Sequence, residues 1–389
     1  MKNIKLYTLL ALLLMAGGAF AQSFTSVCET GQNLQYAVTS VDPPEVTIER
    51  CLDYFGGVTI PDTVEYDNTK YAVVAIGFHS FMDGCGSMNF SGPLVIPNTV
   101  REIGARAFWD CWFTGPLVIP NSVQTIGEYA FFRCKKFTSL TLSESLTYIE
   151  ESCFDECDNM RGDLIIPESV VDVASYGFSR CAFDGVLSLS PNMRYVMHSS
   201  FVELFNITAI EIPEGVEFID WMALDFLHKP TALELPSSLS YIEDLAFCNL
   251  FNLEQMTVNA SVPPIIWDET FKQVNRDIPI YIPVGTLDAY QNAQYWSEFT
   301  NFIEKEGVGV GEHEDVPSVF VYPNPTADRV HIEGFEPNEV QVYDAIGRLL
   351  KTVQGAKEIS LGVFPKGVYL LRIADAEGRS HAARVALKE

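Results

Sequence analysis

The chain has 389 residues, 48% of them hydrophobic, and a formal net charge of −26 at pH 7. An acidic excess of this size repels nucleic acid and anionic lipid, so it argues against both as partners and favours basic ones. A large net charge is also typical of secreted proteins, because repulsion between the molecules keeps them in solution. Beyond the N-terminal segment, no run approaches the roughly 20 apolar residues of a transmembrane helix, so we expect no membrane span.

Residues 1–21 have the layout of a secretory signal peptide. Lys2 and Lys5 precede the apolar run Leu9–Met15, and an A-x-A cleavage motif ends at Ala21. A basic start, an apolar stretch too short for a bilayer and a small-residue cleavage site predict that this segment is removed on export.

After a β-rich stretch at 22–57, predicted to be a small N-terminal β cap, the chain repeats itself. Blocks of similar sequence recur at steps of 23 or 24 residues. A period in the twenties predicts a stacked solenoid in residues 58–279 and not a globule with a buried pocket, because each repeat buries its apolar face only against its neighbours. The clearest blocks start at Leu94, Leu117, Leu140, Leu164, Leu187, Ile210 and Leu233, and looser copies start at Met256 and Ile280.

Each block carries the same core pattern. Apolar residues at its first and third positions predict a short strand with both side chains on one face, and the proline that follows in most blocks ends that strand. A second apolar pair and a small–aromatic pair complete the interior. In the copy at 117–134 these positions are Leu117, Ile119, Pro120, Val123, Ile126, Ala130 and Phe131.

The unit L-x-I-P-x-x-V-x-x-I-x-x-x-A-F-x-x-C resembles the BspA-like leucine-rich repeats of bacterial surface proteins. The resemblance covers about residues 58–299 and is carried by many copies in phase. It implies a leucine-rich-repeat solenoid of short strands, turns and short helical segments, on a protein that adheres to host matrix or to other cells. Two repeats depart from the pattern, with Leu204 and Leu227 in place of the cysteine and Leu224 in place of the phenylalanine.

Four successive blocks carry a cysteine seventeen residues after the block start, so the four side chains point the same way into the core. Leucine replaces cysteine at this position in later repeats, as expected for a small buried apolar residue. We therefore predict buried, reduced thiols, although cysteines of secreted proteins usually form disulfides. In the cap, Cys28 and Cys51 form either a bridge or two free thiols, and both remain open. The ladder cysteines are Cys111, Cys134, Cys157 and Cys181.

The repeat phase fades after the last copy. Residues 280–303 begin as a repeat and become amphipathic, which predicts a C-terminal cap of the solenoid, and the acidic, Gly-rich residues 304–317 predict a linker. Residues 318–389 alternate polar and apolar side chains between turn signals, which predicts a small all-β sandwich of the Ig-like type. Its nine acidic and nine basic residues cancel, so the whole acidic excess precedes it.

This last segment also resembles a secretion signal. Tyr322-Pro-Asn-Pro325, Tyr343-Asp344, Gly347-Arg348-Leu349 and Lys366–Leu371 occur in an order similar to that of the type A sorting domain of the type IX (Por) secretion system. The resemblance implies recognition of residues 318–389 by the type IX secretion machinery and export across the outer membrane of a Gram-negative bacterium. The final location would be outside the cell or on its outer surface.

Motifs for catalysis and cofactor binding are missing. The six histidines are at least 18 residues apart, and none belongs to an H-x-x-x-H or H-E-x-x-H pattern. There is no G-x-S-x-G, no P-loop and no G-x-G-x-x-G motif after a strand. We therefore predict no enzymatic activity, no cofactor and no metal site.

One column of outward-facing positions is aromatic. In each repeat, one residue lies directly before the second member of the second apolar pair. In repeats three to seven this residue is aromatic four times, and Asp172 is the exception. Exposed aromatic residues at regular spacing are typical of protein interfaces, so we predict a partly exposed binding stripe. Its acidic border would consist of Glu211, Glu217, Asp220 and Glu234. The alternative is that the rings pack on one another and stiffen the coil. The predicted binding residues are Tyr148, Tyr195, Phe218 and Tyr241.

These observations favour a secreted or cell-surface binding protein without catalysis. Its solenoid would contact an extracellular or cell-surface protein, with basic host matrix proteins as one class of partner. That partner class rests on the resemblance and on the charge. A structural or scaffolding component of the cell envelope is the first alternative, and an enzyme whose site is assembled only in space is the second.

Overall fold

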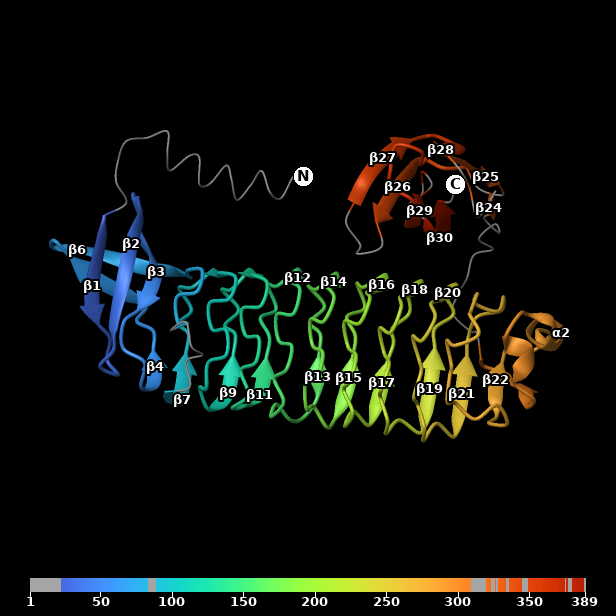
Figure 1. Ribbon diagram of the computed structural model, residues 1–389, viewed down its shortest axis with the longest axis horizontal. Helices are drawn as coiled ribbons and strands as arrows, with labels where there is room; N and C mark the ends of the chain where they lie inside the picture. Colours follow the sequence, from blue (N-terminus) through green and yellow to red (C-terminus); the bar gives the residue numbers. More distant parts are fainter. Residues whose placement is uncertain are drawn as a thin grey trace. The chain divides into compact units, whose positions relative to one another are not determined.

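A computed structural model describes residues 22–82, 89–308, 320–322, 326, 328–333, 336–344, 349–374, 376 and 380–387. The predicted signal peptide, residues 309–317 of the predicted linker and parts of the sorting motifs, among them Pro323–Pro325 and Gly347-Arg348, lie outside the described residues. The fold is a β-solenoid of about eleven turns with almost no helix, followed by a set of C-terminal strands (Figure 1). The chain divides into two compact units, Met1–Arg161 and Gly162–Glu389.

The first unit joins an antiparallel cap to parallel coils. Its described strands are β1 (Ser23–Val27), β2 (Asn33–Val41), β3 (Pro44–Cys51), β4 (Gly56–Thr59), β5 (Thr63–Tyr66), β6 (Thr69–Ile76), β7 (Phe90–Val95), β8 (Glu102–Ile103), β9 (Gly115–Val118), β10 (Thr125–Ile126), β11 (Phe137–Thr141) and β12 (Tyr148–Ile149). β1, β2 and β3 pair in antiparallel fashion, and β3, β6, β8 and β10 then pair in parallel, so the cap sheet continues directly into the coils. On another face, β4 pairs with β7 and β9 pairs with β11.

The second unit begins with coils of the same kind. Its solenoid strands are β13 (Leu164–Ile165), β14 (Asp172–Val173), β15 (Val186–Ser188), β16 (Tyr195–Val196), β17 (Ala209–Glu211), β18 (Phe218–Ile219), β19 (Ala232–Leu235), β20 (Tyr241–Ile242), β21 (Gln255–Val258), β22 (Ile280–Ile282) and β23 (Phe302–Glu304). β13, β15 and β17 pair in parallel on one face, and β16, β18 and β20 pair in parallel on another (Figure 1). Equivalent repeat positions face each other, for example Leu164 and Leu187.

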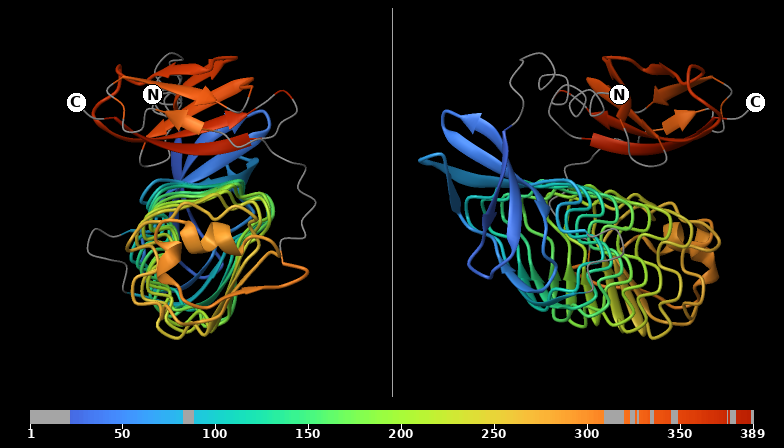
Figure 2. Two further views of the ribbon diagram at one scale, coloured as in Figure 1. Left: turned by 90° about the vertical axis from the view of Figure 1, so that its right-hand side faces the viewer. Right: turned by 60° about the vertical axis from the view of Figure 1, so that its left-hand side comes forward.

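A short helical segment closes the last coil. The helix α2 (Leu287–Asn292) and the 3-10 helix η1 (Trp296–Glu298) lie across its end (Figure 2). Tyr290 and Trp296 are fully buried there. The Tyr290 hydroxyl donates to the carbonyl of Ala260 at 2.6 Å, and Trp296 Nε1–H donates to the carbonyl of Pro264 at 2.7 Å. These bulky side chains therefore cover the open core without leaving a buried donor unpaired.

The solenoid interior is a stack of equivalent side chains. In the first unit, the rings of Phe108, Phe131 and Phe154 lie one above another with centroids 5.1 and 5.3 Å apart, and all three are fully buried. Burial stabilises each ring by roughly 1.5–3 kcal/mol, and a ring pair adds about 0.5–1.5 kcal/mol. The strands end ahead of the prolines, as predicted, since β9 stops at Val118, two residues before Pro120.

Each coil bends at left-handed residues that the repeat pattern does not predict. In the coil at 117–134 they are Tyr129 and Arg133, with φ of 57° and 59°. A non-glycine residue in this region costs roughly 1–2 kcal/mol. Their N–H groups donate to the carbonyls of Glu151 and Asp155 in the next coil, at 3.0 and 2.9 Å. The turns therefore join adjacent coils through hydrogen bonds that offset part of the strain.

The predicted cysteine ladder is buried and forms no disulfide, and neither do Cys28 and Cys51 in the cap. In the first unit, each ladder thiol donates to the carbonyl of the interior phenylalanine one coil earlier. Burial raises the pKa of the Cys134 thiol well above its usual value, so the thiol keeps its proton for this bond. The donor–acceptor distances are 3.4 Å from Cys111 to Phe81, 3.0 Å from Cys134 to Phe108 and 3.3 Å from Cys157 to Phe131.

Cys134→Ser should lower the free energy of unfolding by about 1–3 kcal/mol, because the shorter side chain draws the donor away from Phe108 and places a more polar group in the core. Urea unfolding measures the change, and Cys134→Ala is the control that removes the donor without adding polarity. Thiol labelling should find the ladder unreactive in the native protein and reactive after denaturation without reductant. Disulfides between neighbouring ladder cysteines, detected by mass spectrometry, would contradict this account.

The C-terminal strands form two antiparallel sheets. The strands are β24 (Phe320–Tyr322), β25 (Arg329–Glu333), β26 (Glu339–Asp344), β27 (Leu349–Gln354), β28 (Glu358–Ser360), β29 (Gly367–Ala374) and β30 (Ser380–Leu387). One sheet has the order β24-β25-β28 and the other β27-β26-β29-β30. Val330 and Ile359 from the first sheet share a buried core with Val340 and Leu371 from the second. Within the described residues this domain is therefore all-β and has its own core.

Candidate functional site

The structure aligns three of the four predicted binding residues. Tyr195, Phe218 and Tyr241 stand opposite one another on the paired strands β16, β18 and β20. Phe218 and Tyr241 are only 5% and 7% exposed, so the prediction that these two are partly exposed is wrong. Tyr195, and Tyr148 on β12, are half-buried.

Contacts between neighbouring coils cause this burial. The rings of Phe218 and Tyr241 stack with centroids 5.0 Å apart, and Trp267 donates its Nε1–H to the Tyr241 hydroxyl at 2.8 Å. Paired strands lie only about 4.8 Å apart, so outward rings on successive strands meet one another before they meet solvent. Glu217, expected in the acidic border of the stripe, is itself buried. Phe218 and Tyr241 therefore pack within the coil, as in the alternative that the sequence left open.

A different column of rings is more exposed. Phe205, His228 and Phe251 each stand eighteen residues after a block start, so reading the repeats down this one position would have revealed them. Their ring centroids are 5.1 Å apart at each step. Phe226 joins them, 6.2 Å from Phe205 and 5.9 Å from His228. Phe205 is 40% exposed and Phe251 54%. We call these four residues the aromatic turn patch.

The turns that carry the aromatic turn patch are held by buried side chains of the solenoid interior. Glu203 and Phe226 are left-handed, with φ of 61° and 60°, and so is Asn249 in the next coil, with φ of 62°. The residues that follow Glu203 and Phe226, Leu204 and Leu227, are fully buried. These are the leucines that depart from the cysteine pattern. Buried leucines thus hold the turns, while the side chains directly after them, Phe205 and His228, are more exposed.

A second aromatic cluster lies in the first unit. The guanidinium carbon of Arg106 is 5.3 Å from the ring centroids of both Trp109 and Tyr129, and these two rings stack at 5.4 Å. Tyr129 donates its hydroxyl hydrogen to Glu151 at 2.8 Å. A cation over an aromatic face contributes about 0.5–1 kcal/mol at exposed sites. In this cluster the chain itself supplies the cation that the rings attract.

Metal-ligand groups and membrane helices are absent from the described part of the chain. No three His, Cys, Asp or Glu side chains there are grouped so as to hold a metal ion. None of the described helices has the length and apolar character to cross a bilayer.

Burial lowers the pKa of His198, so this half-buried histidine is neutral at pH 7. Its ring centroid lies 4.9 Å from that of Trp221.

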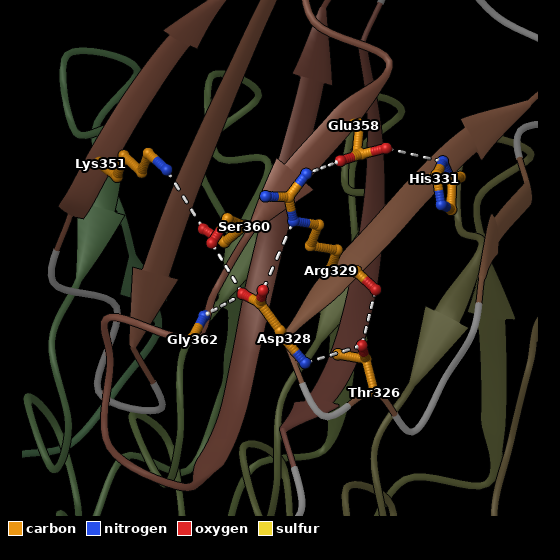
Figure 3. Close-up of polar contacts among 8 residues, drawn as sticks. All are labelled: Thr326, Asp328, Arg329, His331, Lys351, Glu358, Ser360 and Gly362. Carbon is orange, nitrogen blue, oxygen red and sulfur yellow. Dashed lines mark hydrogen bonds and ion pairs between the residues drawn. The ribbon is translucent and has the colours of Figure 1, made fainter.

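Asp328 joins two segments of the C-terminal domain (Figure 3). Its Oδ1 accepts hydrogen bonds from the Ser360 hydroxyl at 2.7 Å and from the Gly362 N–H at 2.9 Å. Its Oδ2 lies 3.4 Å from Arg329 Nε, and Arg329 also pairs with Glu358. The Ser360 bond, followed by the Gly362 bond, holds the pKa of Asp328 below its usual value. The carboxylate thus ties the start of β25 to the end of β28.

Asp328→Asn should make the C-terminal domain less stable at neutral pH, and this deficit should shrink in acid. The folded pKa lies below the unfolded value of about 3.9, so the ionised form stabilises the fold above about pH 4 and this stabilisation is lost as the pH falls through the folded pKa. The proteolysis rate of the domain in the full protein, followed from neutral pH into acid, measures the effect. Glu336→Gln is the control, and a deficit that stays constant throughout would contradict the role of charge.

Short parallel strands on the coil faces, with buried phenylalanine and cysteine ladders inside, define a leucine-rich-repeat solenoid. The family profile of the BspA type leucine rich repeat region matches residues 74–186 and 162–277, in six copies. The chain belongs to this family. The profile of the secretion system C-terminal sorting domain matches residues 320–388, which marks the chain for type IX secretion to the cell surface or outside.

Three solved structures resemble parts of the chain. A leucine rich cell surface protein from Faecalibacterium prausnitzii A2-165 is 17% identical, covers 75% of this chain and 97% of that chain, and has a TM-score of 0.40. The T. pallidum leucine rich repeat protein is 21% identical, covers 57% of this chain and 87% of that chain, and has a TM-score of 0.42. A leucine-rich repeat protein from Bacteroides ovatus ATCC 8483 is 17% identical, covers 70% of this chain and 98% of that chain, and has a TM-score of 0.27. No curated protein matches the chain.

Proposed function

We propose that this protein is a binding protein of the cell exterior. Its solenoid contacts an extracellular or cell-surface protein, in adhesion to host matrix or to other cells, after the type IX machinery of a Gram-negative bacterium has exported it. Stacked repeats present long faces and need no chemical step to act. Proteins of this family and fold are typically non-enzymatic, which agrees with such a role.

The charge distribution carries the proposal and supports a basic partner. Residues 318–389 contain nine acidic and nine basic residues, so the acidic excess lies in the solenoid and linker. A negative field of this kind speeds encounter with positively charged proteins and weakens as salt screens it. Basic host matrix proteins are therefore the class of partner that we expect.

Exposed apolar side chains add contact area to the strand faces. Val118 in β9 and Ile165 in β13 occupy the outward position between two core side chains, and both are exposed. Apolar side chains bordered by polar ones are typical of interaction surfaces. Of the predicted stripe, which lies on other strands, we keep Tyr148 and Tyr195 as proposed binding residues and assign Phe218 and Tyr241 to support of the coil.

Binding to a panel of purified matrix proteins tests the proposal. The secreted protein should bind basic members of the panel with an affinity that falls as salt rises, and it should not bind acidic members of similar size. Failure to bind any member at low salt would contradict adhesion to matrix. Light scattering addresses the scaffolding alternative, since a monomer is expected for a binding protein and self-assembly for an envelope scaffold.

A further inference from the structure

The aromatic turn patch combines exposed rings with acidic surroundings. Residues 187–255, the repeats that carry it, contain ten Asp or Glu and two Lys or Arg. Glu203 lies beside Phe226, because its N–H donates to the carbonyl of the preceding residue, Asp225, at 3.0 Å. The faces of aromatic rings carry negative potential, so rings and carboxylates here attract the same kind of group, a cation.

Four half-buried rings elsewhere in the described residues, and the buried ring of Phe299, receive a cation from the chain itself. Within the described ranges, no Lys or Arg lies over a ring of the aromatic turn patch. The rings of the patch are thus free to take a cation from outside. The cation–ring pairs in the described residues are Arg106 with Trp109 and Tyr129, Lys136 with Trp112, Arg276 with Phe299, and Lys305 with Tyr281.

We infer that the aromatic turn patch binds Arg and Lys side chains of a basic segment of the protein partner. Phe205 and Phe251 are the exposed rings that receive the cations, His228 and Phe226 form the apolar floor between them, and Glu203 adds an opposite charge at the edge. The inference rests on the proposed function and narrows it to one surface and one chemistry. A neutral polysaccharide stacked on the same rings would gain nothing from the acidic surroundings, so a basic protein segment is favoured.

Titration of the full secreted protein with a synthetic peptide of alternating Arg and Ser tests this inference. Phe205→Ala/Phe251→Ala should weaken binding about tenfold, because both exposed ring faces are lost. Phe205→Leu/Phe251→Leu keeps apolar volume but removes the rings, and it should weaken binding similarly. The matched control is Phe55→Ala/Phe78→Ala, which removes two exposed rings from the first unit and should leave the affinity unchanged.

Two comparison ligands decide the chemistry of the occupant. The same peptide with Glu in place of Arg and a neutral dextran should both bind more weakly than the Arg peptide. Equal affinity of the wild type and the leucine variant for the Arg peptide would overturn the inference, and so would preferential binding of dextran. Thermal unfolding of each variant is followed in parallel, and the leucine variant decides the question where the alanine variant is unstable.

The outcome also separates this inference from the proposed function. Loss of Arg-peptide binding in both patch variants, with no matrix protein bound by the wild type, would sustain the patch and refute adhesion to matrix. Matrix binding that is indifferent to both patch variants would sustain the proposed function and overturn the patch as its site.

Discussion

Removing residues 320–388 should trap the protein in the periplasm while its solenoid stays folded. The removed segment matches the sorting domain and has its own buried core. The solenoid has a separate cap, in which Tyr290 and Trp296 are fully buried, so its core does not depend on the removed domain. Cell fractionation, combined with protease digestion of intact cells, measures the change in location.

A second variant serves as the control, because it tests whether a change in the solenoid alone also prevents delivery to the cell exterior. Phe205→Ala/Phe251→Ala alters the solenoid surface but retains the sorting domain, and it should reach the cell exterior as the wild type does. Normal surface delivery of the truncated chain would contradict the assignment of residues 320–388 as a sorting domain. Degradation of the truncated chain in the periplasm would instead contradict the independence of the solenoid fold.

Phe131→Ala should lower the free energy of unfolding by about 3–5 kcal/mol, the usual cost of a cavity at a fully buried phenylalanine. The ring lies between those of Phe108 and Phe154, so the substitution breaks two stacking contacts and leaves the neighbouring coils without a common packing surface. Because a repeat is stable only against its neighbours, we expect the loss to spread beyond one coil. Urea unfolding of the full protein gives the change in stability.

The control for this substitution is an exposed ring in the same unit. Phe78 is 60% exposed and stacks on the adjacent His79, so Phe78→Ala should change the free energy of unfolding by no more than about 0.5 kcal/mol. A small effect of Phe131→Ala, comparable to that of Phe78→Ala, would mean that the phenylalanine stack does not stabilise the solenoid.

Much of the solenoid could be predicted from the sequence by itself, because it depends on residues within one repeat and on the likeness of neighbouring repeats. The 23-residue period and the apolar–x–apolar–Pro pattern predicted strands such as β9, which ends two residues before Pro120. The constant position of the ladder cysteines predicted their burial, which is complete at Cys134. A shared position in a periodic chain repeats the same surroundings, so burial along the stack follows from the period.

Exposure at the surface was decided only by the tertiary structure. Phe218 and Phe205 are both aromatic residues at non-core positions of their repeats, yet the first is 5% exposed and the second 40%. The ring of Tyr241 covers Phe218, and Tyr241 is in turn held by Trp267, which is 26 residues further along the chain. The repeat pattern reports on which side of a strand a side chain lies. It does not report how far side chains from other coils cover it, because that depends on contacts between residues distant in sequence.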